Sequence, residues 1–203
     1  MSDRFPSEES PRAVGVEPVL LDRLLIGAET ARSDALFVVA DGRLVAARTF
    51  GGEDAPRFVR SLADDIAILA GGEAGGQGTN LRPSDLAALG QALVDGGTWT
   101  GAPVVPEGWT DALALPTGEL AGNWTAQPDP TDPARPPVGF GHVTDDGEAL
   151  LMYPEARLVV VRTMRRVGNR YDRRYDARDR MEWLDEMAES IAVEKLGRPP
   201  LHE

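Results

Sequence analysis

The sequence predicts an α/β protein of the α+β type, built on one antiparallel sheet of about five strands. Two apolar runs, residues 35–40 and 44–50, flank Asp41-Gly42-Arg43, and Asp-Gly between apolar runs is a strong hairpin signal. Later in the chain, turn residues separate three short apolar or alternating runs that predict consecutive antiparallel strands. These three runs are residues 138–143, 148–153 and 157–163. An apolar island around residues 120–124 is a candidate for one more short strand.

Helical periodicity lies before, between and after these strands. Leucines recur at helical spacing over residues 18–32, and Pro18 suits a first helical turn. The last helix is expected over residues 178–196, and Gly197 and Pro199 end it. Shorter helices are expected over residues 61–70, 83–94 and 106–113. We therefore expect the terminal helices to cover one face of the sheet and the short middle helices to cover the other.

The length of 203 residues suits one core of ordinary size. Residues 1–16 are charged and contain two prolines, so we expect a disordered leader. A single domain is expected over residues 17–196, followed by a tail over residues 197–203. Within that domain the glycine-rich stretch 71–80 is expected to be a flexible connector.

Composition excludes several classes of function. A net charge of −12 disfavours a nucleic-acid partner, because phosphate backbones are themselves negative. The chain has no cysteine and only two histidines, so we expect no metal site and no cofactor. No apolar run approaches the roughly 18 residues that a membrane-spanning helix needs, and no secretory signal is evident. A cytoplasmic protein without membrane contact is the resulting expectation.

One segment departs from this acidic character. Eight arginines lie between residues 162 and 180, against Asp172, Asp176 and Asp179. The favoured interpretation is a solvated turn and helix start whose charges pair with the acidic remainder. The alternative is a docking surface for an acidic partner.

Several stretches occur together in an informative order. They are residues 33–45, Ser61-Leu62-Ala63-Asp64, residues 82–97 and 105–109, Gly122-Asn123-Trp124, Gly139-Phe140-Gly141-His142 and residues 154–162. In order and spacing they resemble the serine β-lactamase and penicillin-binding-protein-like fold, especially its class C-like β-lactamase and esterase branch. The resemblance covers about residues 20–192. It implies a nucleophilic serine at Ser61, at the start of a helix.

The same resemblance implies further catalytic groups that this chain lacks. The family places a lysine one helical turn after the serine, where this chain has Asp64, and its single lysine is Lys195. The family's Tyr-x-Asn element has no counterpart here, and the helical insertion that carries it looks deleted between Ser61 and Arg82. The family's Lys/His-x-Gly strand survives in part as His142-Val143-Thr144, with threonine in place of glycine.

These departures leave two interpretations of the candidate site residues. Ser61 and Asp64 fit a capping box at a helix start, since an ordinary aspartate is a poor base for a hydroxyl. His142 is favoured as a structural strand histidine, and a Ser61–His142 catalytic pair across the old cleft is the alternative. Trp124 and Thr144 are the candidate binding positions. The chain's tryptophans are expected to be core or loop anchors in preference to a ligand cage.

The function predicted from the sequence is a reduced, non-catalytic relative of these hydrolases that acts as a binding or assembly module. A homodimer or a protein partner is expected on the face that the missing insertion uncovers. The alternative is an active serine hydrolase of small esters or amides, using Ser61 with His142 and Asp64.

Overall fold

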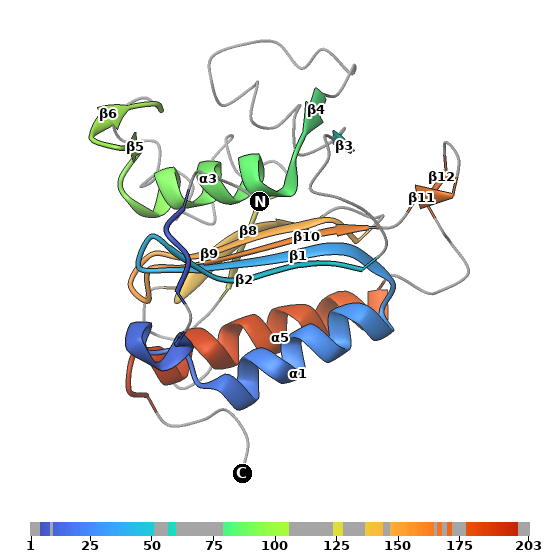
Figure 1. Ribbon diagram of the computed structural model, residues 1–203, viewed down its shortest axis with the longest axis horizontal. Helices are drawn as coiled ribbons and strands as arrows, with labels where there is room; N and C mark the ends of the chain where they lie inside the picture. Colours follow the sequence, from blue (N-terminus) through green and yellow to red (C-terminus); the bar gives the residue numbers. More distant parts are fainter. Residues whose placement is uncertain are drawn as a thin grey trace.

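The computed structural model describes residues 5–8, 10–50, 57–59, 79–105, 124–127, 137–143, 147–164, 166–167, 170–171 and 178–198. Its central feature is an antiparallel sheet of six strands (Figure 1). In order across the sheet these are β2 (Arg43–Thr49), β1 (Ser33–Ala40), β10 (Leu158–Met164), β9 (Ala149–Tyr153), β8 (Gly139–Val143) and β7 (Trp124–Gln127). The predicted fold class is confirmed, and β7 adds a sixth strand beside the five expected.

In the part of the chain that the structure describes, three helices cover the sheet in the predicted layers. Helices α1 (Pro18–Thr30) and α5 (Arg178–Lys195) lie side by side on one face, and α3 (Pro83–Val94) lies on the other (Figure 1). The helices predicted over residues 61–70 and 106–113 lie outside the described residues.

Among the described residues, three two-stranded pairs accompany the main sheet. They are β3 (Arg57–Val59) with β4 (Thr79–Leu81), β5 (Thr98–Trp99) with β6 (Ala102–Pro103), and β11 (Arg166–Val167) with β12 (Arg170–Tyr171).

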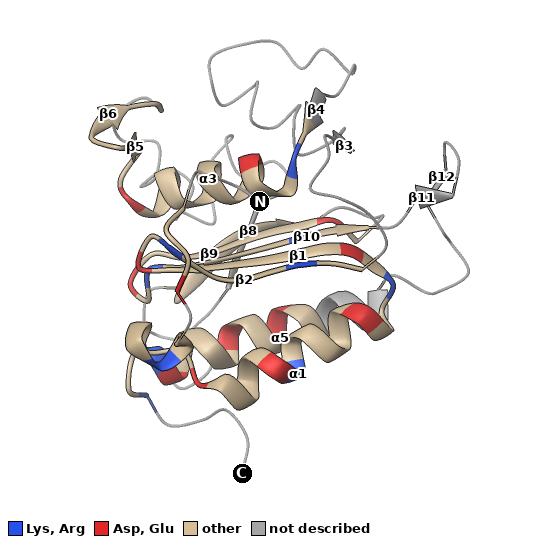
Figure 2. Ribbon diagram, in the orientation of Figure 1, with Lys and Arg blue, Asp and Glu red and all other residues tan. Residues whose placement is uncertain are grey.

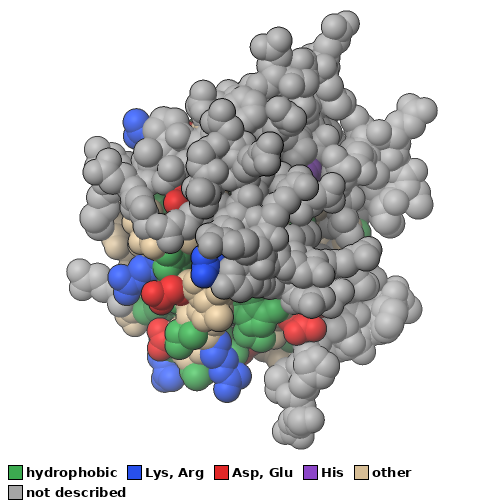
Figure 3. Space-filling model, turned by 90° about the vertical axis from the view of Figure 1, so that its right-hand side faces the viewer, with side chains coloured by type: hydrophobic (Ala, Val, Ile, Leu, Met, Phe, Trp, Pro, Cys, Tyr) green, Lys and Arg blue, Asp and Glu red, His purple; other side chains and the backbone are tan. Residues whose placement is uncertain are grey.

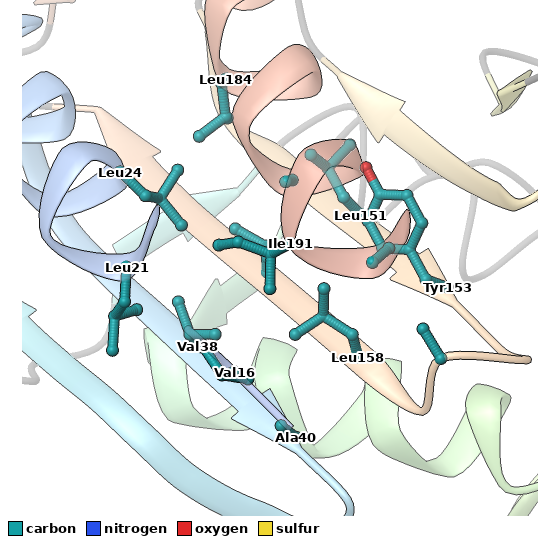
Figure 4. Close-up of a cluster of buried hydrophobic side chains, with 14 of the residues drawn as sticks. Val16, Leu21, Leu24, Val38, Ala40, Leu151, Tyr153, Leu158, Leu184 and Ile191 are labelled. Atoms are coloured by element: carbon teal, nitrogen blue, oxygen red, sulfur yellow. The ribbon is translucent and has the colours of Figure 1, made fainter. Parts of the chain in front are cut away.

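The face under α1 and α5 is packed with buried side chains, mostly aliphatic, from both helices and from the strands (Figure 4). Leu24 of α1, Leu184 and Ile191 of α5, and Val38 of β1 are all essentially inaccessible to solvent. The two helices approach closely because Gly27 leaves room for the Trp183 ring, whose nearest atom lies 1.7 Å from where a Cβ would stand. Trp183 is thus a core anchor, as expected for the chain's tryptophans.

Helix α3 packs equally closely on the opposite face. At Gly90 a Cβ would lie 2.6 Å from Val159 and 2.8 Å from Leu150, so glycine allows the helix to rest on the strands. Its buried residues include Leu86 and Leu93 on the sheet side and also Ser84 and Gln91. Helix α3 is therefore buried on more than one of its sides.

The N-terminal region differs from the expected disordered leader. Phe5 is buried in the α3-face core, and Val14 and Val16 are buried in the α1/α5-face core. Val14 is the last residue of a short 3-10 helix, η1 (Pro11–Val14). The apolar side chains at these three positions supply contacts that a count of prolines and charges does not reveal.

Charged residues lie mainly on the helices, at the turns and at strand ends, as the colours of Figure 2 show. Among the described residues, no helix is both long enough and apolar enough to span a bilayer.

Candidate functional site

His142 occupies a defined position on the α3 face of the sheet. Phe140, two residues earlier on β8, belongs to the core under α3. The intervening Gly141 faces the other way, since a Cβ there would contact Leu151 of the opposite core. Strand alternation therefore directs His142 toward the α3 side.

The strand registers place His142 in one row that crosses the sheet. Phe37 of β1 pairs with Val161 of β10, Val161 pairs with Leu150 of β9, and Leu150 pairs with His142. His142 in turn pairs with Trp124 of β7. Across the sheet, three apolar residues therefore come before His142 in this row. The row ends at Trp124, one of the two candidate binding positions.

Burial controls the protonation of this histidine. His142 is 1% exposed, and desolvation lowers its pKa from 6.5 to about 4. The ring is neutral at physiological pH, and its low basicity makes it a weak proton acceptor there. An efficient general base has a pKa near the working pH.

Two further polar residues on this face were not singled out by sequence reasoning. Thr163 on β10 is 1% exposed, and its Oγ1 has no hydrogen-bond partner among the described residues. Glu148 precedes β9 and is 3% exposed. Continuing the β9–β10 register by one residue sets Glu148 opposite Thr163 and diagonal to His142. Both residues could have been noticed in the sequence, because each is a polar residue at a core-facing position of an otherwise apolar run.

Lys195, the single lysine of the chain, lies on the other side of the sheet. Its Nζ donates to the carbonyl of Val14 at 2.7 Å and to the carboxylate of Asp41 at 2.6 Å. Asp41 is in the turn four residues beyond Phe37, and β1 lies three strands from β8. Strand spacings put the two positions about 13 Å apart along the strands and about 14 Å across them.

The structure says less about the other candidate residues. Ser61, Asp64 and Thr144 lie outside the described residues, so the capping box and the Ser61–His142 pair stay predictions. For Trp124 the structure gives the backbone position opposite His142. Among the described residues there is no group of three or more side chains able to hold a metal ion.

The basic segment needs a correction at its first member. Arg162 is 1% exposed, so assigning it to a solvated segment or a docking surface is wrong. Its Nε donates to Ser33 Oγ at 2.8 Å, and a terminal nitrogen donates to the Ala31 carbonyl at 3.0 Å. Ala31 ends α1, so the guanidinium neutralises the negative end of that helix.

Comparisons with known proteins support the fold. No family model matches the chain, and no curated protein matches it. Its structure is similar to a solved structure described as "Putative 6-aminohexanoate-dimer hydrolase from Bacillus anthracis", with a TM-score of 0.63 and 14% sequence identity. The match covers 97% of this chain and 89% of that one. At this identity the likeness shows a shared fold.

Proposed function

We propose that this chain is a degenerate, non-catalytic member of the serine β-lactamase-like fold group, and that it acts as a binding or assembly module. The observation that carries the proposal is the position of Lys195. A serine hydroxyl needs an adjacent base to become a nucleophile, and in this fold group the resemblance assigns that task to a lysine. The single lysine here is held by Asp41 and Val14, on the face opposite the candidate site.

The state of His142 supports the same proposal. With a pKa of about 4 the ring accepts a proton weakly at neutral pH, so it is a poor substitute for the missing lysine. Losing the members of a catalytic unit commonly lowers turnover by about 10⁴ to 10⁶. The buried ring is well suited to a structural role in the row of Leu150 and Val161.

The partner in this proposal is a second copy or another protein, bound on the face that the shortened middle of the chain uncovers. Where the described side chains reach the surface in Figure 3, hydrophobic, acidic and basic groups are interspersed. Sedimentation of the full chain over a range of concentrations tests the homodimer, and retention of a partner by immobilised full chain tests the other case. A protein that stays monomeric and retains no partner would contradict the assembly role.

One observation favours a second candidate function. The similar solved structure is described as a hydrolase, and His142 lies on the face that carries α3, in the row next to Trp124. The second candidate is a serine hydrolase of small esters or amides, using Ser61 with His142 and Asp64.

Covalent labelling separates the two functions. The full chain and the Ser61→Ala variant are incubated with a fluorophosphonate and, separately, with a β-lactam, and intact mass is measured. The non-catalytic proposal predicts no adduct on either protein. A stoichiometric adduct on the wild type that is absent from Ser61→Ala would establish the hydrolase in its place.

A further inference from the structure

The outer edge of β2 carries a contact that neither proposed function uses. Strand β2 ends the main sheet, and on its outer side Leu44 pairs with the N-terminal segment, residues 5–8. The Leu44 amide donates to the Pro6 carbonyl at 2.9 Å, and the Glu8 amide donates to the Leu44 carbonyl at 3.0 Å. This bridge is parallel, whereas the strands of the sheet pair antiparallel. In Figure 1 the dark blue segment crosses from the α3 side to the α1/α5 side.

Two side chains of the segment make specific contacts on either side of this bridge. The Phe5 ring is 7% exposed and meets the Trp99 ring edge-on, with centroids 5.3 Å apart. Glu8 forms an ion pair with Arg43, at 3.3 Å. The edge thus receives an extended segment with an aromatic residue and, three positions later, a carboxylate. This is the pattern of strand addition, in which backbone bonds attach a segment and side-chain sites select it.

Release of the segment withdraws one side chain, Phe5, from the α3-face core. Among the described residues, the segment is held to the rest of the chain by two backbone hydrogen bonds, one buried ring and one ion pair that is partly exposed on its Arg43 side. The next anchors belong to a separate cluster, where Val14 and Val16 pack under α1 and the Val14 carbonyl is held by Lys195. Segments with few contacts open at low cost relative to global unfolding.

Release of the segment exposes an edge that continues past the bridge. Beyond Leu44, residues 45–49 of β2 are half-buried or exposed, and among the described residues none of them forms an outward backbone hydrogen bond. The register shift between Val38 and Val39 leaves Val45 as an extra residue, so a bulge separates Leu44 from the rest of this edge. An exposed strand edge is a ready template for another chain.

We propose that the outer edge of β2 is a strand-docking surface, closed in cis by the N-terminal segment and able to take the same segment from a second copy of this chain. The second copy is the partner because its residues 5–8 reproduce every contact seen in cis. Reciprocal exchange also closes into a two-fold dimer. This surface is distinct from the face uncovered in the middle of the chain, so the inference goes beyond the proposed function.

A peptide test asks whether the edge accepts a segment in trans. A labelled peptide of residues 1–10 is titrated into the full chain and into its Phe5→Ala variant, and anisotropy is measured. Phe5→Ala weakens the cis contact and leaves the edge intact, so at least about tenfold tighter binding than to the wild type is expected. A peptide with the Phe5→Ala change should bind at least tenfold more weakly than the wild-type peptide.

Two further variants control the peptide test. Glu8→Arg opposes Arg43 without altering the core, so it should open the edge even where Phe5→Ala fails to fold. Leu89→Ala on α3 weakens the same core outside the segment and should leave peptide binding at the wild-type level. Equal binding to all four proteins, or no binding to any, overturns the docking surface.

Cross-linking tests the second copy. Because the chain has no cysteine, Glu8→Cys and Arg43→Cys can be made in separate molecules, mixed, and treated with a short bis-maleimide. Exchange predicts a covalent dimer that excess peptide suppresses. A control mixture of Glu8→Cys with Glu186→Cys, exposed on α5, should give collision background alone. If the Arg43→Cys mixture gives no more dimer than this control, the second copy is ruled out as the partner.

Discussion

The two faces of the sheet bury polar groups in different ways. Under α1 and α5, the buried arginine Arg162 holds the end of α1 through Ala31 and Ser33, so its place there has a structural explanation. On the α3 face, His142 lies in the apolar row and Thr163 lies beside it. The family resemblance singles out His142, so the α3 face is the one on which a site is proposed.

The largest expected effect comes from a comparison of a fully buried leucine on α1 with a partly buried leucine on α3. Leu24→Ala, on the fully buried side of α1, should lower the free energy of unfolding by about 3 kcal/mol. Leu89→Ala, which is partly buried on α3, should cost about 1 kcal/mol. Urea unfolding measures both. Equal losses of unfolding free energy at Leu24 and Leu89 would contradict the difference in burial between these two side chains.

A second prediction concerns acid stability through His142. Its pKa is lowered from 6.5 to about 4 on folding, so the unfolded state binds a proton more readily between these values. The contribution of neutral His142 to the free energy of unfolding should be fully present above pH 6.5. It should fall by about 3 kcal/mol as the pH drops toward 4. His142→Gln should abolish that part of the pH dependence in urea unfolding. An unchanged slope would show that the imidazole does not titrate in this way.

On the α1/α5 face, Asp185 of α5 should make stability change with pH in the opposite direction. Burial raises the pKa of Asp185 from 3.8 to about 6, so its contribution is favourable below pH 3.8 and is lost as the pH rises through 6. Asp185→Asn should therefore stabilise the protein at pH 7.5. The expected gain is about 1 kcal/mol, reduced from the full value because the carboxyl is partly exposed to solvent. Unfolding at pH 5 should show a smaller gain, and a loss of stability at both pH values would count against the assignment.

A similarly small effect, part of which depends on salt, is expected at the turn end of the sheet. Lys195→Met removes the ion pair with Asp41 and the bond to Val14, and should cost about 1 kcal/mol. Part of that cost should disappear in about 0.5 M salt, because the ion pair is partly exposed. Thermal unfolding at two salt concentrations measures it. A much larger loss would mean that Lys195 supports more than this corner of the fold.

The sequence was sufficient to predict the main layers of the fold for clear physical reasons. Asp41-Gly42 marked the first hairpin, and helical spacing placed α3 at Pro83–Val94, as observed. The N-terminal segment was misjudged because Phe5 gains its burial from Trp99 and Leu44, which are distant in the sequence. Local composition does not encode such contacts.

The candidate site was only partly predictable. His142 followed from the family resemblance, but its burial and low pKa depend on the row formed with Leu150 and Val161. Arg162 was grouped with its basic neighbours because charge counting ignores strand alternation. Alternation also brings Glu148 and Thr163 to this face, and only the registers of three strands show it.

The most direct test of the central claim is the pKa of His142 in solution. A two-dimensional ¹H–¹³C NMR titration of the imidazoles is simple, since the chain has two histidines and His142→Gln assigns the signal. A structural, neutral histidine predicts a midpoint near pH 4 for His142, the same in the wild type and in Ser61→Ala. A midpoint near 7 that shifts in Ser61→Ala would show a coupled serine–histidine pair and contradict the non-catalytic account.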